Sequence, residues 1–210
     1  MPPIADKYLE ERILKAARRL WRTRGERGLT LRAVAREADT TTPTLYKRFR
    51  NKEALRLALA YRLRDELNSQ LFSSPNLEEV CRRYLRYAEE SPHEYELLRI
   101  SWGQLFAPGS PRPGRAWALA QFTARFGGKP ENYASVFDAL FFICHGTATL
   151  LTVTDDKAVR EALRESSINV CDKLLAKDVL ILRWRNARRL SFFSPSSALQ
   201  GLAESLARGR

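Results

Sequence analysis

The stretch TLRAVAREADTTTPTLYKRF, from Thr30 to Phe49, decides the fold of this chain. Its first part places apolar residues at the three- and four-residue spacing of one helical face, namely Leu31, Val34, Ala35 and Ala38. Thr30 stands just before this pattern, where its hydroxyl can cap the free amides of the first turn. Thr41 is a second N-cap candidate, and Pro43 follows in a first turn, where the missing N–H costs nothing. The stretch therefore predicts two short helices joined by a tight turn.

The second of these helices carries hydroxyls and cations on the face that the core does not use. Leu45 and Phe49 lie four residues apart and point inward. The residues left outside or at the margin are Thr42, Thr44, Tyr46, Lys47 and Arg48. Side chains of these kinds reach base edges and phosphates, so the pair is typical of a DNA-binding helix-turn-helix. Each position alone is equally consistent with an ordinary solvated surface residue, and Tyr46 with a packing residue.

Four consecutive segments between Ile13 and Leu55 resemble the DNA-binding domain of the TetR family of bacterial transcriptional regulators. They read ILKAARRLW, TLRAVAREA, TTPTLYKRF and NKEAL, in that family's order and at its spacing. The Leu45-Tyr46 pair, Phe49 and the Lys52-Glu53 step are the most recognisable marks. The resemblance implies DNA contacts, with Thr30 and Arg32 approaching phosphates, Tyr46 and Lys52 holding the backbone, and the following residues on the recognition helix: Thr41, Thr42, Thr44 and Lys47. Asp39 departs from the family, which usually has glycine in this turn, and we expect local strain there.

Positive charge is concentrated where this motif lies. Residues 1–56 carry 15 Lys and Arg against 7 Asp and Glu, residues 57–177 carry 15 against 15, and residues 178–210 carry 6 against 2. This asymmetry indicates polyanion binding. Membrane-surface binding would share it, but the charge on a DNA-binding motif favours double-stranded DNA.

The remaining composition argues against several other classes of protein. The three cysteines, Cys81, Cys144 and Cys171, look too few and too scattered for a disulfide framework or a metal site. We expect no metal, no cofactor and a reducing cytoplasm. The N-terminus has acidic residues and no apolar core, so we do not expect a secretory signal. No nucleophile motif, phosphate-binding glycine loop or metal-ligand spacing indicates an enzyme.

Apolar periodicity predicts helices through most of the chain. The first runs from an N-cap at Asp6 to Gly25 and has a solvated basic face, formed by Arg12, Lys15, Arg18, Arg19 and Arg22. A fourth helix begins after Asn51 and continues to Phe72. Further helices are expected over 77–90, 94–106 and 117–126, with a loop at 107–114 and a break at 127–130.

The stretch from Tyr133 to Val153 is the most apolar in the chain. Its length would allow a membrane span, but polar residues dilute it, and we interpret it as a buried helix. By resemblance, the helices at about 132–153 and 155–177 pair with their copies across a two-fold axis and form a homodimer. The His145-Gly146 pair resembles one AcrR-like subgroup of the family. A lone histidine on an apolar helix is nevertheless more often a core residue, and Cys144 and His145 point about 100° apart, so they do not form a catalytic pair.

These observations lead to one interpretation. We expect an all-α fold, with an N-terminal three-helix helix-turn-helix domain over 1–50 and a C-terminal helical ligand-binding and dimerisation domain over 51–177. Residues 178–210 form an extension of uncertain role. The expected function is a sequence-specific transcriptional regulator, a repressor released by a small hydrophobic ligand. The alternative is a non-specific polyanion or membrane-surface binding protein. Large side chains with few charges nearby are the candidate pocket walls: Trp102, Phe106, Trp117, Phe122, Phe141 and His145.

Overall fold

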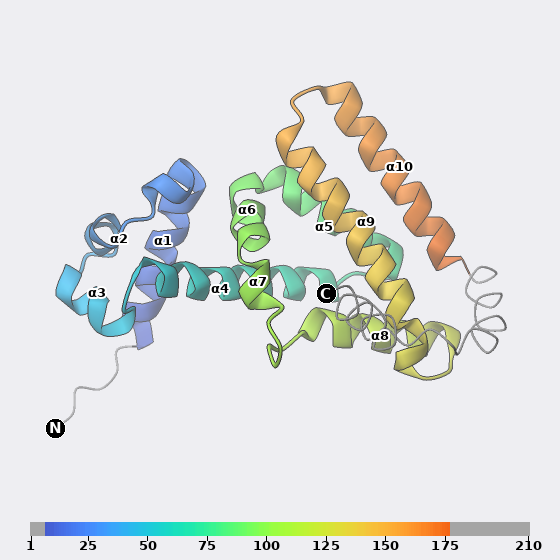
Figure 1. Cartoon of the computed structure of the whole chain (residues 1–210), viewed down its shortest axis with the longest axis horizontal. Coiled ribbons are helices and arrows are strands. Elements are labelled where there is room, and N and C mark those ends of the chain that lie inside the picture. The colour runs from blue at the N-terminus through green and yellow to red at the C-terminus, as the bar shows by residue number, and fades with distance from the viewer. Residues whose placement is uncertain (1–6, 177–210) are drawn as a thin grey trace, which may run out of the picture.

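A computed structural model describes residues 7–176 as an all-α fold (Figure 1). The first helices are α1 (Lys7–Gly28), α2 (Leu31–Glu37), α3 (Thr42–Arg48) and α4 (Lys52–Phe72). They are followed by α5 (Leu77–Glu90), α6 (Pro92–Ile100), α7 (Trp102–Leu105), α8 (Pro113–Phe126), the 3-10 helix η1 (Pro130–Tyr133), α9 (Ala134–Val153) and α10 (Lys157–Leu175). The predicted all-α class with an N-terminal helix-turn-helix is confirmed. The proposed cap at Asp6 and the extension 178–210 lie outside the described residues.

Side-chain caps start the helices at the predicted places. Asn51 Oδ1 accepts a hydrogen bond from Ala54 N at 2.8 Å and begins α4. Asp156 Oδ1 accepts one from Ala158 N at 2.8 Å and begins α10. Gly25, the predicted end of the first helix, has φ 57° and kinks the chain, but helical turns resume and α1 ends at Gly28.

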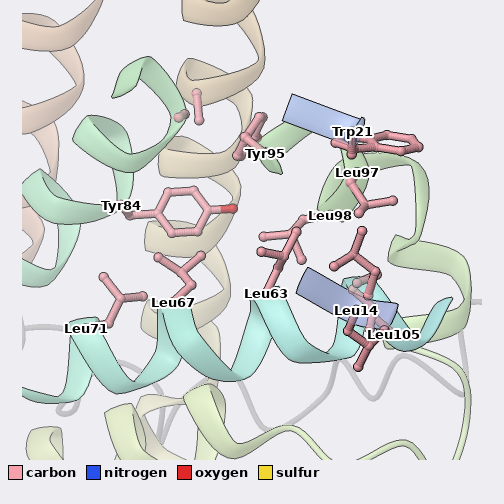
Figure 2. Packing of buried hydrophobic residues seen from close by; sticks show 14 of the residues in the cluster. Leu14, Trp21, Leu63, Leu67, Leu71, Tyr84, Tyr95, Leu97, Leu98 and Leu105 are labelled. Carbon is pink, nitrogen blue, oxygen red and sulfur yellow. The ribbon is translucent and has the colours of Figure 1, made fainter. Parts of the chain in front are cut away.

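The long helix α4 connects the two halves of the molecule (Figure 1). Five of its leucines recur every four residues and are buried, at Leu55, Leu59, Leu63, Leu67 and Leu71. In Figure 2 the side chains of Leu63 and Leu67 rise from α4 toward Leu98 and Tyr84. One apolar stripe on a single helix thus packs against α1 at one end and against α5 and α6 further along.

An ion-pair network joins α1 to α4 and α6. Arg18 Nε and Nη2 donate to the two carboxylate oxygens of Glu94 at 2.7 and 3.0 Å, and Nη1 donates to Glu66 Oε2 at 2.7 Å. The Glu94 side chain is 2% exposed. Beside it, the Trp21 indole N–H donates to the carbonyl oxygen of His93. The predicted solvated basic face of the first helix is therefore wrong at Arg18, because partners on α4 and α6 surround this guanidinium.

Two predicted boundaries in the middle of the chain are also wrong. The single helix expected over 94–106 is divided into α6 and α7 at Ser101, whose hydroxyl is buried. A break of this kind is invisible to periodicity, since both pieces bury the same face. Pro113 and Gly114, expected in a loop, form the first turn of α8, where proline is favourable. A Cβ on Gly114 would lie 2.9 Å from Asn68 Oδ1, so this glycine allows α8 to approach α4 closely.

The apolar helix α9 is buried on one face only. Val136, Leu140, Cys144, Ala148 and Leu151 face the core, where α9 packs against α5 and α10. On the opposite face Phe142, Leu150 and Val153 are 68%, 48% and 74% exposed. The interpretation of a fully buried helix is thus correct for half of its circumference. Among the described residues, Pro130–Val153 has the length and mean hydropathy, 1.6, of a membrane span, which alone is weak support for one.

Candidate nucleic-acid interface and regulatory cavity

The turn between α2 and α3 is built around one strained residue. Asp39 has φ 50°, the left-handed conformation expected for this position, and is the one non-glycine residue between 7 and 176 with positive φ. Thr40 N donates to Ala35 O at 2.9 Å across the turn. Leu45, on the inner face of α3, is fully buried. The turn and this anchor together fix the direction in which α3 presents its outer face.

Most of the predicted DNA-contacting side chains lie on the surface of this domain. The exposed ones are Thr30, Arg32, Thr41, Tyr46 and Lys47, and the half-buried ones are Thr42, Thr44 and Lys52. Tyr46 is 52% exposed. Lys47 has no carboxylate within ion-pair distance among the described residues. The outer face of α3 therefore offers an available cation, a phenol and hydroxyls together.

Several of these side chains also have structural partners. Thr30 Oγ1 accepts from Ala33 N at 3.1 Å and starts α2. Thr41 Oγ1 accepts from Thr44 N at 3.3 Å and lies 2.8 Å from Thr44 Oγ1. Lys52 Nζ donates to the Glu26 carbonyl at 3.2 Å, which ties the start of α4 to the end of α1. Sequence reasoning anticipated the caps but missed this anchoring contact of Lys52.

A cavity of about 160 Å³ lies between α4, α5, α8 and α9. Four of the predicted wall residues line it: Trp102, Trp117, Phe122 and Phe141. Phe106 and His145 are not part of the lining, although Phe106 packs on Trp102 with ring centroids 4.4 Å apart. Arg64, Asn68, Arg112 and Arg115 add polar groups to an otherwise largely apolar wall. The indole N–H of Trp102 is buried without a hydrogen-bond partner among the described residues.

Residues 13–59 match the family model described as bacterial regulatory proteins, tetR family. The matched segment includes the helix-turn-helix of α2 and α3, so this part of the chain is similar to that family. A search of curated proteins found no match to the chain.

The whole described fold is similar to solved structures of regulators. A tetR-family transcriptional regulator from Streptomyces coelicolor is 17% identical, with a TM-score of 0.61, over 98% of this chain and 100% of that one. The Q116A variant of TetR from Acinetobacter baumannii AYE, in complex with minocycline, is 20% identical, with a TM-score of 0.58, over 77% and 91%. The multidrug binding protein EbrR with imidazole is 24% identical, with a TM-score of 0.55, over 83% and 93%. The likeness of fold to these structures thus extends beyond residues 13–59 into the C-terminal half of the chain.

His145 is packed into a polar network behind the cavity wall. The Tyr95 hydroxyl lies 2.8 Å from His145 Nδ1, and the Tyr84 hydroxyl lies 3.2 Å from it. The imidazole stacks on Phe141 with centroids 5.6 Å apart. Burial, with a smaller contribution from the charge of Arg99, lowers the pKa of His145. This histidine is a partnered core residue that joins α5, α6 and α9.

Because the folded protein disfavours protonation of His145, stability should fall on mild acidification. The folded pKa lies below the unfolded value of about 6.5, so the unfolded chain binds more protons as pH falls below that value. The contribution of His145 to the free energy of unfolding is present at neutral pH and is lost as the pH decreases toward the folded pKa. Melting temperatures at about pH 7.5 and about pH 6 measure this loss.

Replacing either histidine identifies the responsible group, since the chain has two. The His145→Gln variant should lose most of the pH dependence in this window, whereas His93→Gln, at an exposed position, should keep it. Equal pH dependence in the two variants would contradict the assignment.

Proposed function

We propose that this protein is a tetR-family transcriptional repressor that binds a near-palindromic operator as a homodimer and releases it on binding a small hydrophobic ligand. The proposal rests above all on the outer face of α3. There Lys47 and Tyr46 are exposed beside the half-buried Thr42 and Thr44, on a helix whose inner side is anchored by Leu45. The histidine-glycine pair on α9 supports an AcrR-like assignment, and the similarity of residues 13–59 to transcriptional regulators favours a non-enzymatic role in the cytoplasm.

The exposed apolar face of α9 and α10 supports the homodimer. Five of the eight exposed large hydrophobic side chains of the described residues lie on these two helices: Phe142, Leu150, Val153, Val159 and Val170. A concentration of this kind on two adjacent helices is typical of a protein interface. Two copies joined through these faces would form a four-helix bundle.

Two recognition helices in one dimer require matching half-sites. Their centres should lie about 34 to 36 Å apart, or somewhat more, on one face of the DNA. The operator should be nearly palindromic, because the two-fold axis of the dimer relates the half-sites. Affinity should decrease steeply as salt rises, since Lys and Arg side chains displace counterions from phosphates.

Replacing Lys47 or Thr44 with alanine should weaken binding to any duplex that the wild-type protein selects. Loss of one phosphate or base contact is expected to cost about 1 to 3 kcal/mol in each half-site. Each lost contact therefore weakens affinity roughly 5- to 150-fold. Fluorescence anisotropy at fixed salt measures the change, and sedimentation checks that the dimer is intact. Arg86→Ala, on α5 and outside the tetR-type domain, is the matched control for the loss of one charge. Unchanged affinity in both α3 variants would refute the interface.

The cavity supports a ligand of one or two rings. Its volume of about 160 Å³ is below the roughly 300 Å³ of sites for drug-sized compounds. The lining includes Leu67, Asn68, Leu71 and Phe72 of α4, the helix that begins immediately after the recognition helix. A ligand that binds only when α4 is shifted would lower the affinity for DNA. Bound DNA would lower the affinity for the ligand by the same coupling free energy.

The variant Trp102→Ala should change both stability and ligand response. Truncating this half-buried indole removes one cavity wall and is expected to cost about 2 kcal/mol, less than the full value for a buried tryptophan. Thermal shift with indole as probe measures both effects. Phe106→Ala, beside Trp102 but outside the lining, should leave the indole-induced shift unchanged. An unaltered melting temperature and an unaltered indole shift in Trp102→Ala would remove this residue from the site.

A further inference from the structure

The three cysteines of the chain meet at one point in the core. Cys81 on α5, Cys144 on α9 and Cys171 on α10 have Sγ atoms that all lie within 4.8 Å of one another. The Cys144 and Cys171 sulfurs are 3.8 Å apart. The residues are 7%, 5% and 0% exposed. The expectation that the cysteines are scattered is therefore wrong, since three helices bring together residues that are far apart in sequence. We propose that this thiol triad binds a trivalent thiophilic metalloid, with arsenite as the probe ligand.

The spacing of the sulfurs suits one central atom. With bonds of about 2.3 Å, the Zn–S length, an ion holds sulfurs about 3.8 Å apart in tetrahedral geometry and about 4.0 Å apart in a trigonal plane. A trivalent arsenic centre carries a lone pair, so its three sulfurs form a pyramid and lie somewhat closer together than in either geometry. The Cys144–Cys171 separation of 3.8 Å is close to what such a centre needs, and the third sulfur, within 4.8 Å of both, approaches by rotation about its χ1 angle. Thiolates select soft ions over the hard cations that prefer oxygen.

Charge balance selects a trivalent centre among the soft ions. Three thiolates around a monovalent or divalent ion leave a net negative charge, whereas three thiolates around a trivalent ion are neutral. Arg82 is the cation whose charge acts on the Cys171 thiol. That charge is already paired with the Asp172 carboxylate at 2.6 Å. A buried charged complex would therefore lack a counter-ion, at considerable cost. The neutral trithiolate complex avoids this cost.

The ligand has a route to the thiols and a polar neighbour beside them. Cys81 and Cys144 both belong to the lining of the cavity. Arsenous acid is small and uncharged at neutral pH, so it can enter an apolar site of this size. One helical turn before Cys171 lies Ser167, which is 5% exposed and whose hydroxyl contributes to lowering the pKa of the Cys171 thiol. This hydroxyl can also accept a hydrogen bond from a departing water or donate one to it.

The binding reaction is an exchange of oxygen for sulfur without oxidation. Each As–O bond breaks as one As–S bond forms, and each oxygen leaves as water with a thiol proton, so three thiols and one arsenous acid give one trithiolate and three waters. Cys81 and Cys144 line the cavity and meet the ligand first, and hydrogen bonds from Cys144 and Cys81 lower the pKa of Cys171, which favours the thiolate that completes the site. Where Cys171 is already ionised, solvent supplies the third proton.

Native mass spectrometry of the full chain tests the site. The protein is reduced with a phosphine, which leaves no competing thiol, and is then incubated with arsenite. The expected product has one arsenic atom per chain and has lost three hydrogens, and X-ray absorption should show three sulfur neighbours. No cysteine lies elsewhere in the sequence, so every As–S bond belongs to the triad. The readout does not depend on DNA binding and stands apart from the proposed regulatory function.

Single replacements make the test specific. Cys81→Ala, Cys144→Ala and Cys171→Ala should each weaken arsenite retention by more than about tenfold, the lower limit for loss of even an outer-shell partner in metal sites. Ser167→Ala keeps all three thiols and should retain arsenic. Circular dichroism shows which variants are folded. The proposal is overturned by reduced, folded wild-type protein that takes up no arsenic, by a folded cysteine variant that holds it as tightly, or by Zn²⁺ or Cd²⁺ binding more tightly than arsenite.

Discussion

Replacing Arg18 with alanine is expected to lower the free energy of unfolding by about 3 kcal/mol. The substitution leaves the Glu94 carboxylate, 2% exposed, without its bidentate partner. Arg22 at 3.6 Å and the Tyr87 hydroxyl at 3.4 Å remain nearby but replace neither of its hydrogen bonds. Because the Arg18 side chain is 34% exposed, we take the lower end of the range for breaking a buried pair. Chemical denaturation of both proteins gives the difference directly.

The adjacent residue provides the control for this prediction. Arg19 pairs with Glu37 at 3.1 Å, but both side chains are exposed, so Arg19→Ala should cost less than about 1 kcal/mol. The double variant Arg18→Ala/Glu94→Ala should recover part of the loss, since it also removes the buried charge. Equal destabilisation by the two arginine variants would show that the network does not hold α1 against α6.

Replacing Phe142 with glutamate is expected to convert the proposed dimer to a monomer. Phe142 is 68% exposed at the centre of the apolar face of α9. A charge there would lie against apolar side chains of the second copy, at a cost of several kcal/mol. A loss of about 3 kcal/mol weakens dimerisation roughly 150-fold. Sedimentation velocity at micromolar concentration measures the change, and operator affinity should fall with it, because one half-site loses its partner.

The matched control places the same charge on another exposed aromatic residue. Tyr8 on α1 is 78% exposed and lies in the other half of the molecule (Figure 1), so Tyr8→Glu should remain dimeric. A Phe142→Glu protein that sediments like the wild type would locate the interface elsewhere.

Local rules predicted a large part of this fold. Caps and apolar spacing predicted α4 from Asn51 and α5 over Leu77–Glu90, because the signals that start and stop those helices lie within one turn of them. The break at Ser101 was not predictable, since the apolar pattern continues across it. Pro113 was read as a loop residue although proline also begins helices.

The sites divide in the same way. The outer face of α3 follows from which residues of one short helix must be buried, so its exposed side chains could be predicted. The partner of Arg18 lies 76 residues further along the chain, and the thiols of Cys81 and Cys171 come from α5 and α10, which are far apart in sequence but pack against each other. No local pattern contains such pairings, because they depend on how helices pack. The cavity lining is predictable only in part. The sequence indicates which large apolar residues are candidates, but helix packing determines that Phe141 lines the cavity and His145 does not.

The most direct test of the DNA-binding proposal is selection of random duplex DNA on the purified protein, sequenced after enrichment at two salt concentrations. We expect a near-palindromic sequence whose half-sites are about one helical turn apart or slightly more. Its enrichment should be lost with the Lys47→Ala protein and reduced at the higher salt concentration. Binding that weakens with salt but enriches no sequence would contradict the account and indicate a general polyanion-binding protein.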